Sequence, residues 1–367
     1  MIIAAHLTVN KHSTPSFLSE CLGRLALQYP DDHFIFFTDE DAGETPALIN
    51  CTYVLISPKI KNSLLLHYWY NYKLPSLLKR YNANVFISEN GMLSIRSNKP
   101  QMMVIKNTFF TKKKLIPGIH SRYLEKFFLP FLKKATAVIT TEKYIEDMLA
   151  AKYSFAADKI LSIYPGLSRN YQPISWQQKE EITAAHADEK DFFIYPVSAN
   201  TKNNIIYVLK AFSQFKKWQK SNMQLLLLLQ HIPGENLIKD FGLYKYRNEV
   251  KIIKQQDDKQ AARIIAAAYA LIYLPAEERI AYPCLHAMQC EVPVITTAGN
   301  LNKSMYEDAA IYASTNEKII AEKMMLVYKD ENLRNDCIKK GLLQTGKYNW
   351  DTSTRLFWQA IIKNSEQ

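Results

Sequence analysis

Residues 191–215 read DFFIYPVSANTKNNIIYVLKAFSQF, and this stretch decides the fold class. Its first seven residues form an apolar run that is typical of a buried strand. After a polar turn, apolar residues recur at helical spacing, at Ile205, Val208, Leu209, Phe212 and Phe215. The stretch therefore predicts a strand followed by an amphipathic helix that packs one face on a sheet.

The same alternation continues in both directions along the chain. Further strands are expected at residues 1–6, 33–38, 52–57, 84–88, 101–105, 137–141, 223–230, 249–254, 270–274, 292–297 and 309–313. Further helices are expected at residues 16–29, 317–329, 331–343 and 350–364. Alternating strands and helices predict parallel, doubly wound sheets, and 367 residues suffice for about two domains.

A polar segment interrupts the alternation. The first set of strands closes near residue 167, and residues 171–190 follow as the expected connection, with Ser175 placed to cap a short helix. Two doubly wound halves are expected to face each other across a cleft. Ligands of such sheets bind at the carboxyl ends of the strands.

Several classes of protein are excluded by composition. The ten glycines cannot be assembled into G-x-G-x-x-G or a P-loop, so a glycine-based phosphate fingerprint is absent. The five cysteines are dispersed, without zinc-ligand spacing, which favours reduced thiols in the cytoplasm. We expect Cys284 and Cys290 to be core residues rather than nucleophiles. No signal peptide or membrane-spanning stretch is expected either.

Positive charge is concentrated in residues 51–140, which hold fifteen basic and two acidic side chains within a chain of net charge +11. Aromatic residues such as Tyr68, Trp69 and Tyr72 are interleaved with them. This composition suits an anionic membrane surface, which would place the protein at the inner face of the cytoplasmic membrane. A solvated basic face is the plain alternative. Nucleic acid is disfavoured, because no RNP, KH, zinc-finger or helix-turn-helix signature occurs.

Two blocks in the second half resemble a known family. Residues 195–212, YPVSANTKNNIIYVLKAF, and 268–297, AYALIYLPAEERIAYPCLHAMQCEVPVITT, resemble the donor-site blocks of retaining nucleotide-sugar glycosyltransferases. The narrower resemblance is to family 4, or group 1, whose members include bacterial surface-polysaccharide enzymes. Residues 74–107 and 135–166 are similar to first-domain segments of the same family.

The resemblance implies a GT-B fold, with two Rossmann-like domains. It implies an acceptor-side domain of residues 1–170, a donor domain of 171–345, and a last helix of 346–367 that crosses back to the first domain. The implied function is metal-independent, cofactor-free transfer of a sugar from a nucleotide-diphosphate sugar to a glycan or lipid-linked acceptor. A non-catalytic GT-B protein, acting as a scaffold or glycan binder, is the alternative.

The resemblance also implies donor-site residues. Lys202, followed by Asn203, would contact the diphosphate at a helix start, where cations and free N–H groups stabilise anions. Glu278 matches the first Glu of the family's Glu-x7-Glu motif and would bind the sugar hydroxyls. His286 occupies the second Glu position, near the ribose, and Arg279 replaces a usual glycine. A solvated lysine and a core histidine are the plain alternatives for Lys202 and His286.

The first half departs further from the family pattern. Lys106-Asn107 stands where the family has His-Asp, and Asn90 stands at a usually acidic position. These changes remove negative charge or add positive charge. Either the donor or acceptor is more anionic than usual, with Lys106 and Arg279 recruited to it, or selection on catalysis has lapsed.

An Asp-x-Asp sequence follows the second expected strand, as Asp39-Glu40-Asp41. In glycosyltransferases of the GT-A fold, such a motif holds a divalent metal ion. Here it comes too early in the chain for that role. We interpret it as a solvated acidic turn and predict no metal site.

Overall fold

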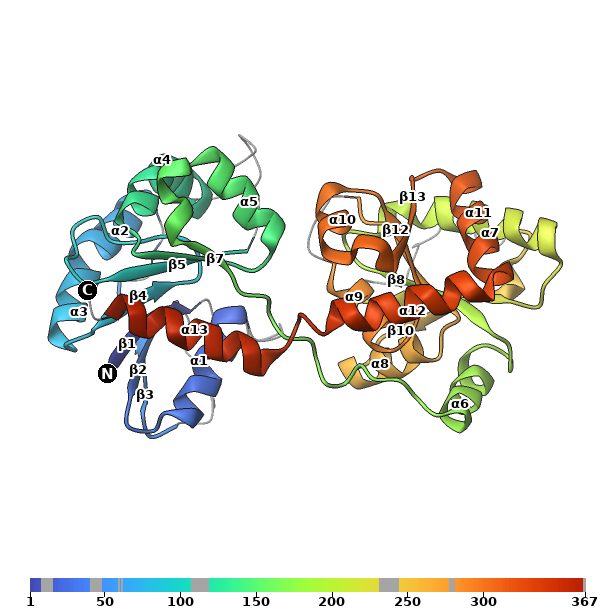
Figure 1. The fold of residues 1–367 in the computed structure, drawn as a ribbon, viewed down its shortest axis with the longest axis horizontal. Helices are drawn as coiled ribbons and strands as arrows, with labels where there is room; N and C mark the ends of the chain where they lie inside the picture. Colours follow the sequence, from blue (N-terminus) through green and yellow to red (C-terminus); the bar gives the residue numbers. More distant parts are fainter. Residues whose placement is uncertain are drawn as a thin grey trace. The chain divides into compact units, whose positions relative to one another are not determined.

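The computed structural model describes residues 1–7, 16–39, 48–58, 60, 62–106, 119–230, 244–276 and 281–365. The chain divides into two compact units, each with its own parallel sheet (Figure 1). Unit 1 comprises Met1–Gly166 and Asn349–Gln367, and unit 2 comprises Leu167–Tyr348. The predicted doubly wound α/β architecture is therefore confirmed.

Unit 1 contains a seven-stranded sheet of order β3-β2-β1-β4-β5-β6-β7. The strands are β1 (Ile2–Leu7), β2 (His33–Thr38), β3 (Cys51–Leu55), β4 (Val85–Ser88), β5 (Gln101–Ile105), β6 (Ala137–Thr140) and β7 (Ile160–Ser162). All neighbours pair in parallel. The central strands read as near-continuous apolar runs because helices cover both faces of a parallel sheet.

The helices of unit 1 are α1 (Phe17–Gln28), α2 (Ser63–Tyr68), the π-helix η1 (Trp69–Lys73), α3 (Leu74–Arg80), α4 (Ile119–Lys134), α5 (Lys143–Lys152), the 3-10 helix η3 (Ser154–Lys159) and α13 (Trp350–Ser365). Helices α1 and α13 lie side by side against one face of the sheet (Figure 1). The last helix thus completes the core around the first strand, with Phe357 packed edge-on against Phe17.

Unit 2 contains a six-stranded sheet of order β10-β9-β8-β11-β12-β13. The strands are β8 (Phe192–Val197), β9 (Gln224–Leu229), β10 (Val250–Lys254), β11 (Ala270–Tyr273), β12 (Val294–Thr297) and β13 (Ala310–Ala313). All neighbours again pair in parallel.

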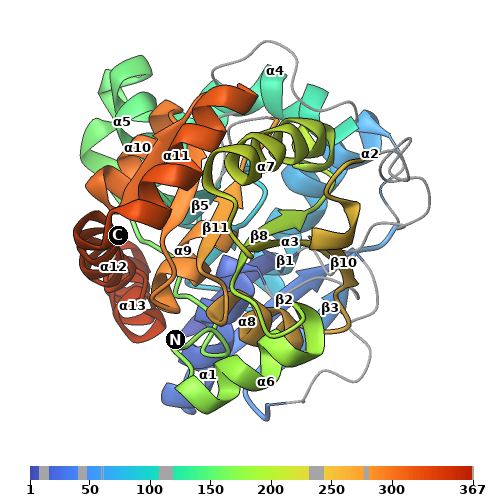
Figure 2. The same cartoon turned by 90° about the vertical axis from the view of Figure 1, so that its right-hand side faces the viewer.

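The helices of unit 2 are α6 (Trp176–His186), α7 (Ile205–Gln219), α8 (Asp258–Ala266), α9 (Tyr282–Gln289), α10 (Asn300–Tyr306), α11 (Glu317–Lys329) and α12 (Glu331–Thr345), with short 3-10 helices η4 (Lys202–Asn204), η6 (Arg247–Glu249) and η7 (Glu307–Ala309). Helices α7 and α11 lie together over one face of the sheet (Figure 2). Helix α9 packs on β11 and β12.

The apolar pattern predicts helix faces well. All five apolar residues expected to line the α7 face are buried, and full burial of each stabilises the fold by about 1.5–3 kcal/mol. Ser175 caps α6 in a capping box with Gln178, as predicted. Leu27 of α1, in contrast, is 68% exposed, because it falls outside the stripe formed by Leu18, Cys21, Leu22 and Leu25.

The segment 171–190, expected to connect the domains, belongs to unit 2. Its start is fastened there by the Asp258 carboxylate. This group accepts hydrogen bonds from Ser168 Oγ at 3.3 Å, Asn170 Nδ2 at 2.7 Å and Tyr171 Oη at 2.8 Å. The chain therefore passes between units at residues 166 and 167, and returns at residues 348 and 349.

Gly166 lies where the chain leaves unit 1, and the first prediction concerns its packing. A Cβ at this position would lie less than 3.0 Å from the Trp350 ring and from the Trp350 backbone nitrogen. We expect Gly166→Ala to lower the free energy of unfolding by about 1–3 kcal/mol, because neither group can move cheaply. Thermal and urea unfolding followed by circular dichroism would measure the loss.

Gly23→Ala is the matched control. Apart from its chain neighbours and the backbone of its own helix, no heavy atom of the described residues lies within 4 Å of a Cβ built at Gly23, which sits inside α1. Alanine is the better helix former, so this variant should gain about 0.5–1 kcal/mol. Equal stability of the two variants would contradict the packing argument.

Candidate functional site

The strand order of each sheet reverses next to its first strand. In unit 1, successive strands extend outward from β1 on one side and from β4 on the other. In unit 2, the corresponding pair is β8 and β11. At such a reversal the connections leave in opposite directions, and the carboxyl ends of the two strands border the usual ligand site of an open α/β sheet.

Lys202 and Asn203 lie at the reversal of unit 2, in η4 between β8 and α7. Both side chains are exposed. No ion pair to Lys202 is formed by the residues that the structure describes. The Lys202 ammonium and the positive end of the α7 dipole give this strand-to-helix turn positive charge.

The turn that carries Lys202 is held rigidly. Thr201 is fully buried, and its hydroxyl donates to Pro196 O at 2.8 Å while accepting from Ser198 N at 2.8 Å. Asn204 Nδ2 donates to Leu274 O at 2.9 Å, and Ala276 N donates to Asn200 O at 2.8 Å. The turn after β8 is thus tied to the segment after β11.

Glu278 and Arg279 come two and three residues after Ala276, and both lie outside the described residues. The bond between Ala276 and Asn200 places the start of their segment beside the Lys202 turn. Their roles at the sugar remain predictions from the resemblance.

His286 lies in the last turn of α9, not at a helix start. Its ring stacks face to face on Tyr171, with centroids 3.8 Å apart and planes inclined by 9°. Burial lowers the pKa of His286 to about 4, although Asp258 acts in the opposite direction. The imidazole is therefore neutral at pH 7, with one nitrogen as donor and the other as acceptor. Within the described parts of the chain, neither nitrogen has a hydrogen-bond partner.

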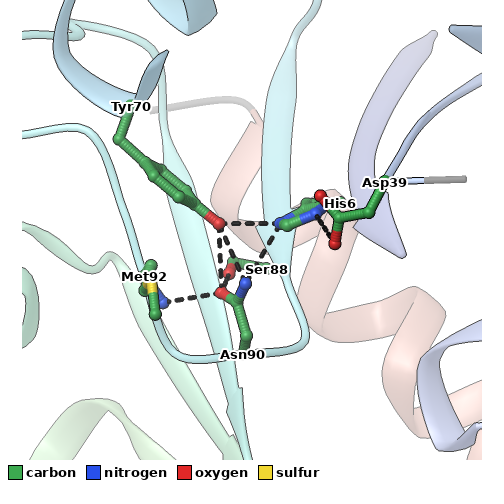
Figure 3. A network of polar contacts seen from close by, with 6 residues as sticks. All are labelled: His6, Asp39, Tyr70, Ser88, Asn90 and Met92. Carbon is green, nitrogen blue, oxygen red and sulfur yellow. Dashed lines mark hydrogen bonds and ion pairs between the residues drawn. The ribbon is translucent and has the colours of Figure 1, made fainter. Parts of the chain in front are cut away.

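Asn90 lies at the reversal of unit 1, in the turn after β4, at the centre of a polar network (Figure 3). Its Oδ1 accepts from Ser88 Oγ at 2.7 Å and from Met92 N at 3.1 Å. Its Nδ2 donates to Tyr70 Oη at 3.0 Å and lies 3.1 Å from His6 Nδ1. Through these hydrogen bonds the Asn90 side chain holds the turn after β4 in one conformation.

The turn after β4 also requires glycine at its next position. Gly91 adopts a φ of 73°, a left-handed conformation that other residues rarely reach without strain. The Asn-Gly pair in the sequence thus sets the geometry of this edge.

His6 and Asp39 complete the network from the ends of β1 and β2 (Figure 3). His6 is almost fully buried; its Nδ1 lies 2.7 Å from Tyr70 Oη, and its Nε2 lies 3.4 Å from Asp39 Oδ2. Asp39 is therefore not simply a solvated acidic residue, because it faces a buried imidazole. Glu40 and Asp41 lie outside the described residues.

Lys106 does not present a free positive charge. Its Nζ lies 2.9 Å from Oε1 of Glu89, which is 4% exposed, while the Lys106 side chain is 42% exposed. The pair joins the ends of β4 and β5, and Glu89 directly precedes Asn90. The added charge of Lys106 is therefore matched by a buried carboxylate. Asn107 lies outside the described residues.

Sequence analysis missed His6, Tyr70 and Glu89. His6 and Glu89 lie at the ends of strands, and Tyr70 lies in the π-helix η1. Their hydrogen bonds join residues that are 17 to 84 positions apart in the sequence. A usable signal existed for two of them. His6 and Glu89 are the polar residues that end or follow the apolar runs of β1 and β4, the strands at the reversal.

Cys284 and Cys290 are buried, and burial raises the pKa of each thiol to about 12, which agrees with core packing. Among the described residues, no three His, Cys, Asp or Glu side chains gather closely enough to hold a metal ion. No helix within the described ranges has the length and apolar character of a membrane span.

Known proteins resemble the chain in sequence and in fold. Residues 177–344 match the family model described as glycosyl transferases group 1. The chain is 21% identical over 285 residues to O-antigen chain mannosyltransferase B of Escherichia coli, covering 76% of this chain and 74% of that protein.

Two solved structures share the fold over almost the whole chain. A glycosyltransferase from Rickettsia africae ESF-5 matches with a TM-score of 0.74 and 13% identity, covering 100% of this chain and 98% of that one. Anabaena Alr3699/HepE, solved in complex with UDP and glucose, matches with a TM-score of 0.72 and 14% identity, covering 99% and 100%. The two parallel-sheet units are thus those of the GT-B fold, and residues 177–344, within unit 2, form a group 1 glycosyltransferase domain.

Proposed function

We propose that the protein transfers a hexosyl residue from a nucleotide-diphosphate sugar to a glycan or lipid-linked acceptor of surface-polysaccharide synthesis. The transfer would retain the anomeric configuration and need no metal ion. The observation that carries the proposal is the exposed Lys202 at the strand reversal of unit 2, on a rigid turn that begins α7. The similarity to an O-antigen chain mannosyltransferase and to a structure containing UDP supports it.

Lys202 would stabilise the leaving group. Cleavage of the glycosidic bond to a nucleoside diphosphate develops negative charge on phosphate oxygens, and preorganised cations and N–H groups meet such charge without reorganisation. In this role Lys202 and the first turn of α7 replace a divalent cation. Asn203, the next exposed residue, would donate a further hydrogen bond to the diphosphate.

The other donor contacts come from the segment after β11 and from α9. We propose that Glu278 binds the sugar hydroxyls and that Arg279 binds an acidic group of the donor. His286 would hydrogen-bond the ribose through a ring edge, because Tyr171 covers one of its faces. A neutral imidazole suits a hydroxyl, which can both donate and accept.

The carboxyl edge of the unit 1 sheet would bind the acceptor. Asn90 holds the turn there, and Lys106 follows β5 at the same edge. We propose that Asn107, the next residue in the sequence, also contributes. Since Glu89 neutralises Lys106, this edge suits a sugar acceptor that bears hydroxyls. Lys106 retains exposed surface through which it can donate further hydrogen bonds.

Nucleotide binding tests the role of Lys202. We expect Lys202→Ala to weaken binding of the preferred nucleoside diphosphate about 10- to 100-fold, the equivalent of one charge-assisted hydrogen bond. Lys210→Ala is the control, since Lys210 is also exposed on α7 but lies two turns further on. Calorimetric titration with UDP and GDP would measure both. Equal affinities of the two variants would show that Lys202 does not contact the diphosphate.

The stereochemistry and metal dependence of the transfer are a second test. With the preferred nucleotide sugar and an acceptor glycan, we expect the product to keep the donor's anomeric configuration, as read from proton NMR coupling constants. Excess EDTA should leave the initial rate unchanged, because fixed cations of the protein meet the phosphate charge. An inverted product, or a rate restored only by added Mg²⁺ or Mn²⁺, would refute this part of the proposal.

His286 gives a prediction about pH. Its pKa is about 4 in the folded protein against 6.5 for a free imidazole. Between these values the unfolded chain binds more protons, so folding stability falls as pH decreases from 6.5 to 4. His286→Phe keeps a ring against Tyr171 but cannot titrate, and its stability should fall less over this range. Thermal melts at several pH values would show this, with His33→Phe, at an exposed position, as the control that changes nothing.

A further inference from the structure

Asp39 is a partly exposed carboxylate at the carboxyl edge of the unit 1 sheet. It directly follows β2, which pairs with β1 so that Leu7 lies opposite Thr38. The Asp39 side chain is 35% exposed, and its Oδ2 lies 3.4 Å from Nε2 of His6 (Figure 3). His6, near the end of β1, is almost fully buried. A carboxylate that solvent can reach is therefore held beside a buried imidazole.

The orientation of Asn90 shows which nitrogen of His6 carries the proton. Asn90 Oδ1 accepts a hydrogen bond from Met92 N at 3.1 Å, and a backbone N–H can only donate. This bond fixes the Asn90 amide, so that Nδ2 is the atom 3.1 Å from His6 Nδ1. Because an amide nitrogen also only donates, His6 Nδ1 is the acceptor. The proton of the neutral imidazole therefore lies on Nε2, the nitrogen that faces Asp39.

Tyr70 supports the same position of the proton. Burial raises the pKa of Tyr70, and the nearby charge of Asp39 adds to this effect, so the hydroxyl keeps its proton. Tyr70 Oη lies 2.7 Å from His6 Nδ1 and 3.2 Å from Asn90 Oδ1, and the shorter contact favours donation to His6. Two donors thus converge on Nδ1, which leaves Nε2–H as the only donor of the ring.

Packing also fixes the His6 ring. Its centroid lies 5.5 Å from that of the Trp69 ring and 6.0 Å from that of the Tyr70 ring, and both partners are buried. Among the residues that the structure describes, His6 Nε2 has no hydrogen-bond partner of standard geometry. A buried N–H group without an acceptor costs about 1–3 kcal/mol, and the Asp39 carboxylate offsets this cost. Contacts of this length commonly tighten when a substrate fixes the carboxylate.

We propose that Asp39 binds a hydroxyl group of the sugar acceptor, and that His6, kept in one tautomer by Asn90, is its positioning residue. The inference rests on the proposed transfer reaction and adds the chemistry of the acceptor. A carboxylate accepts hydrogen bonds from hydroxyl groups, whereas it repels a second carboxylate or a phosphate. The part of the acceptor that meets Asp39 is therefore a neutral sugar with free hydroxyls, and not an acidic sugar.

Acceptor kinetics test the role of Asp39. A methyl glucoside and the corresponding methyl glucuronide are suitable acceptor probes, because the second differs by one carboxylate. We expect Asp39→Asn to raise KM for the glucoside about tenfold or more, the equivalent of one charge-assisted hydrogen bond. The same variant should lower the preference for the glucoside over the glucuronide by a similar factor, which a merely structural change would not do. Asp31→Asn is the matched control, since Asp31 is exposed and precedes the opposite end of β2.

Substitutions of His6 and Asn90 test the positioning. His6→Asn removes the donor that faces Asp39 and should raise KM for the glucoside about threefold or more, whereas His6→Gln can return an amide N–H to the place of Nε2 and should raise it less. Nitrogen-15 NMR of labelled histidine should show the His6 proton on Nε2. In Asn90→Asp a proton should appear on Nδ1, because a carboxylate at position 90 would accept it.

The outcomes are distinguishable. Transfer with an unchanged glucoside KM in Asp39→Asn would overturn the acceptor role of Asp39, and a proton on Nδ1 in the wild-type chain would overturn the positioning by His6. Binding of UDP or GDP without transfer to either glycoside would overturn the acceptor chemistry inferred above. Absence of nucleotide binding would instead refute the proposed function, and the acceptor role with it. Nucleotide affinity should therefore be measured for every variant, and it should equal that of the wild type.

Discussion

The reversal of strand order in each parallel sheet is the constraint on which the functional geometry depends. All strands of a sheet end at the same edge, but only at β1/β4 and β8/β11 do the connections diverge. The polar residues that end or follow these four strands are the ones that the fold gathers: His6 and Asn90 in unit 1, and the Lys202 turn in unit 2.

The two edges differ in how their charges are balanced. In unit 1, Lys106 is paired with Glu89, so these two charges offset each other. In unit 2, Lys202 has no ion-pair partner among the residues that the structure describes. A buried carboxylate without a cation would be costly, which explains why a lysine after β5 is tolerated beside Glu89. Because Glu89 already neutralises Lys106, the presence of a lysine at this position does not require a highly anionic donor or acceptor.

Sequence patterns predicted correctly the structural features that depend only on residues close together in the chain. The α7 stripe and the Ser175 capping box need only residues within a few positions of each other, and both are as expected. The contacts of Asn90 with His6 and Tyr70 span 84 and 20 residues, and no local pattern encodes them. The local sequence did not predict the π-helix η1 either. Trp69 and Tyr70 of this helix are buried in the core, and such packing involves residues far away in the chain.

The π-helix also links the interior of unit 1 to its surface. Residues two apart lie on opposite sides of a helix, so this short segment directs Tyr70 to the His6–Asn90 network and Tyr72 to solvent. Asn71 lies between them and fixes Ile95 by its side chain. Because Ile95 follows the turn that Asn90 holds in place, the strand end at the site and the exposed Tyr72 share one buried support, Asn71. A substitution of Asn71 would therefore alter both the edge of the sheet and the exposed surface.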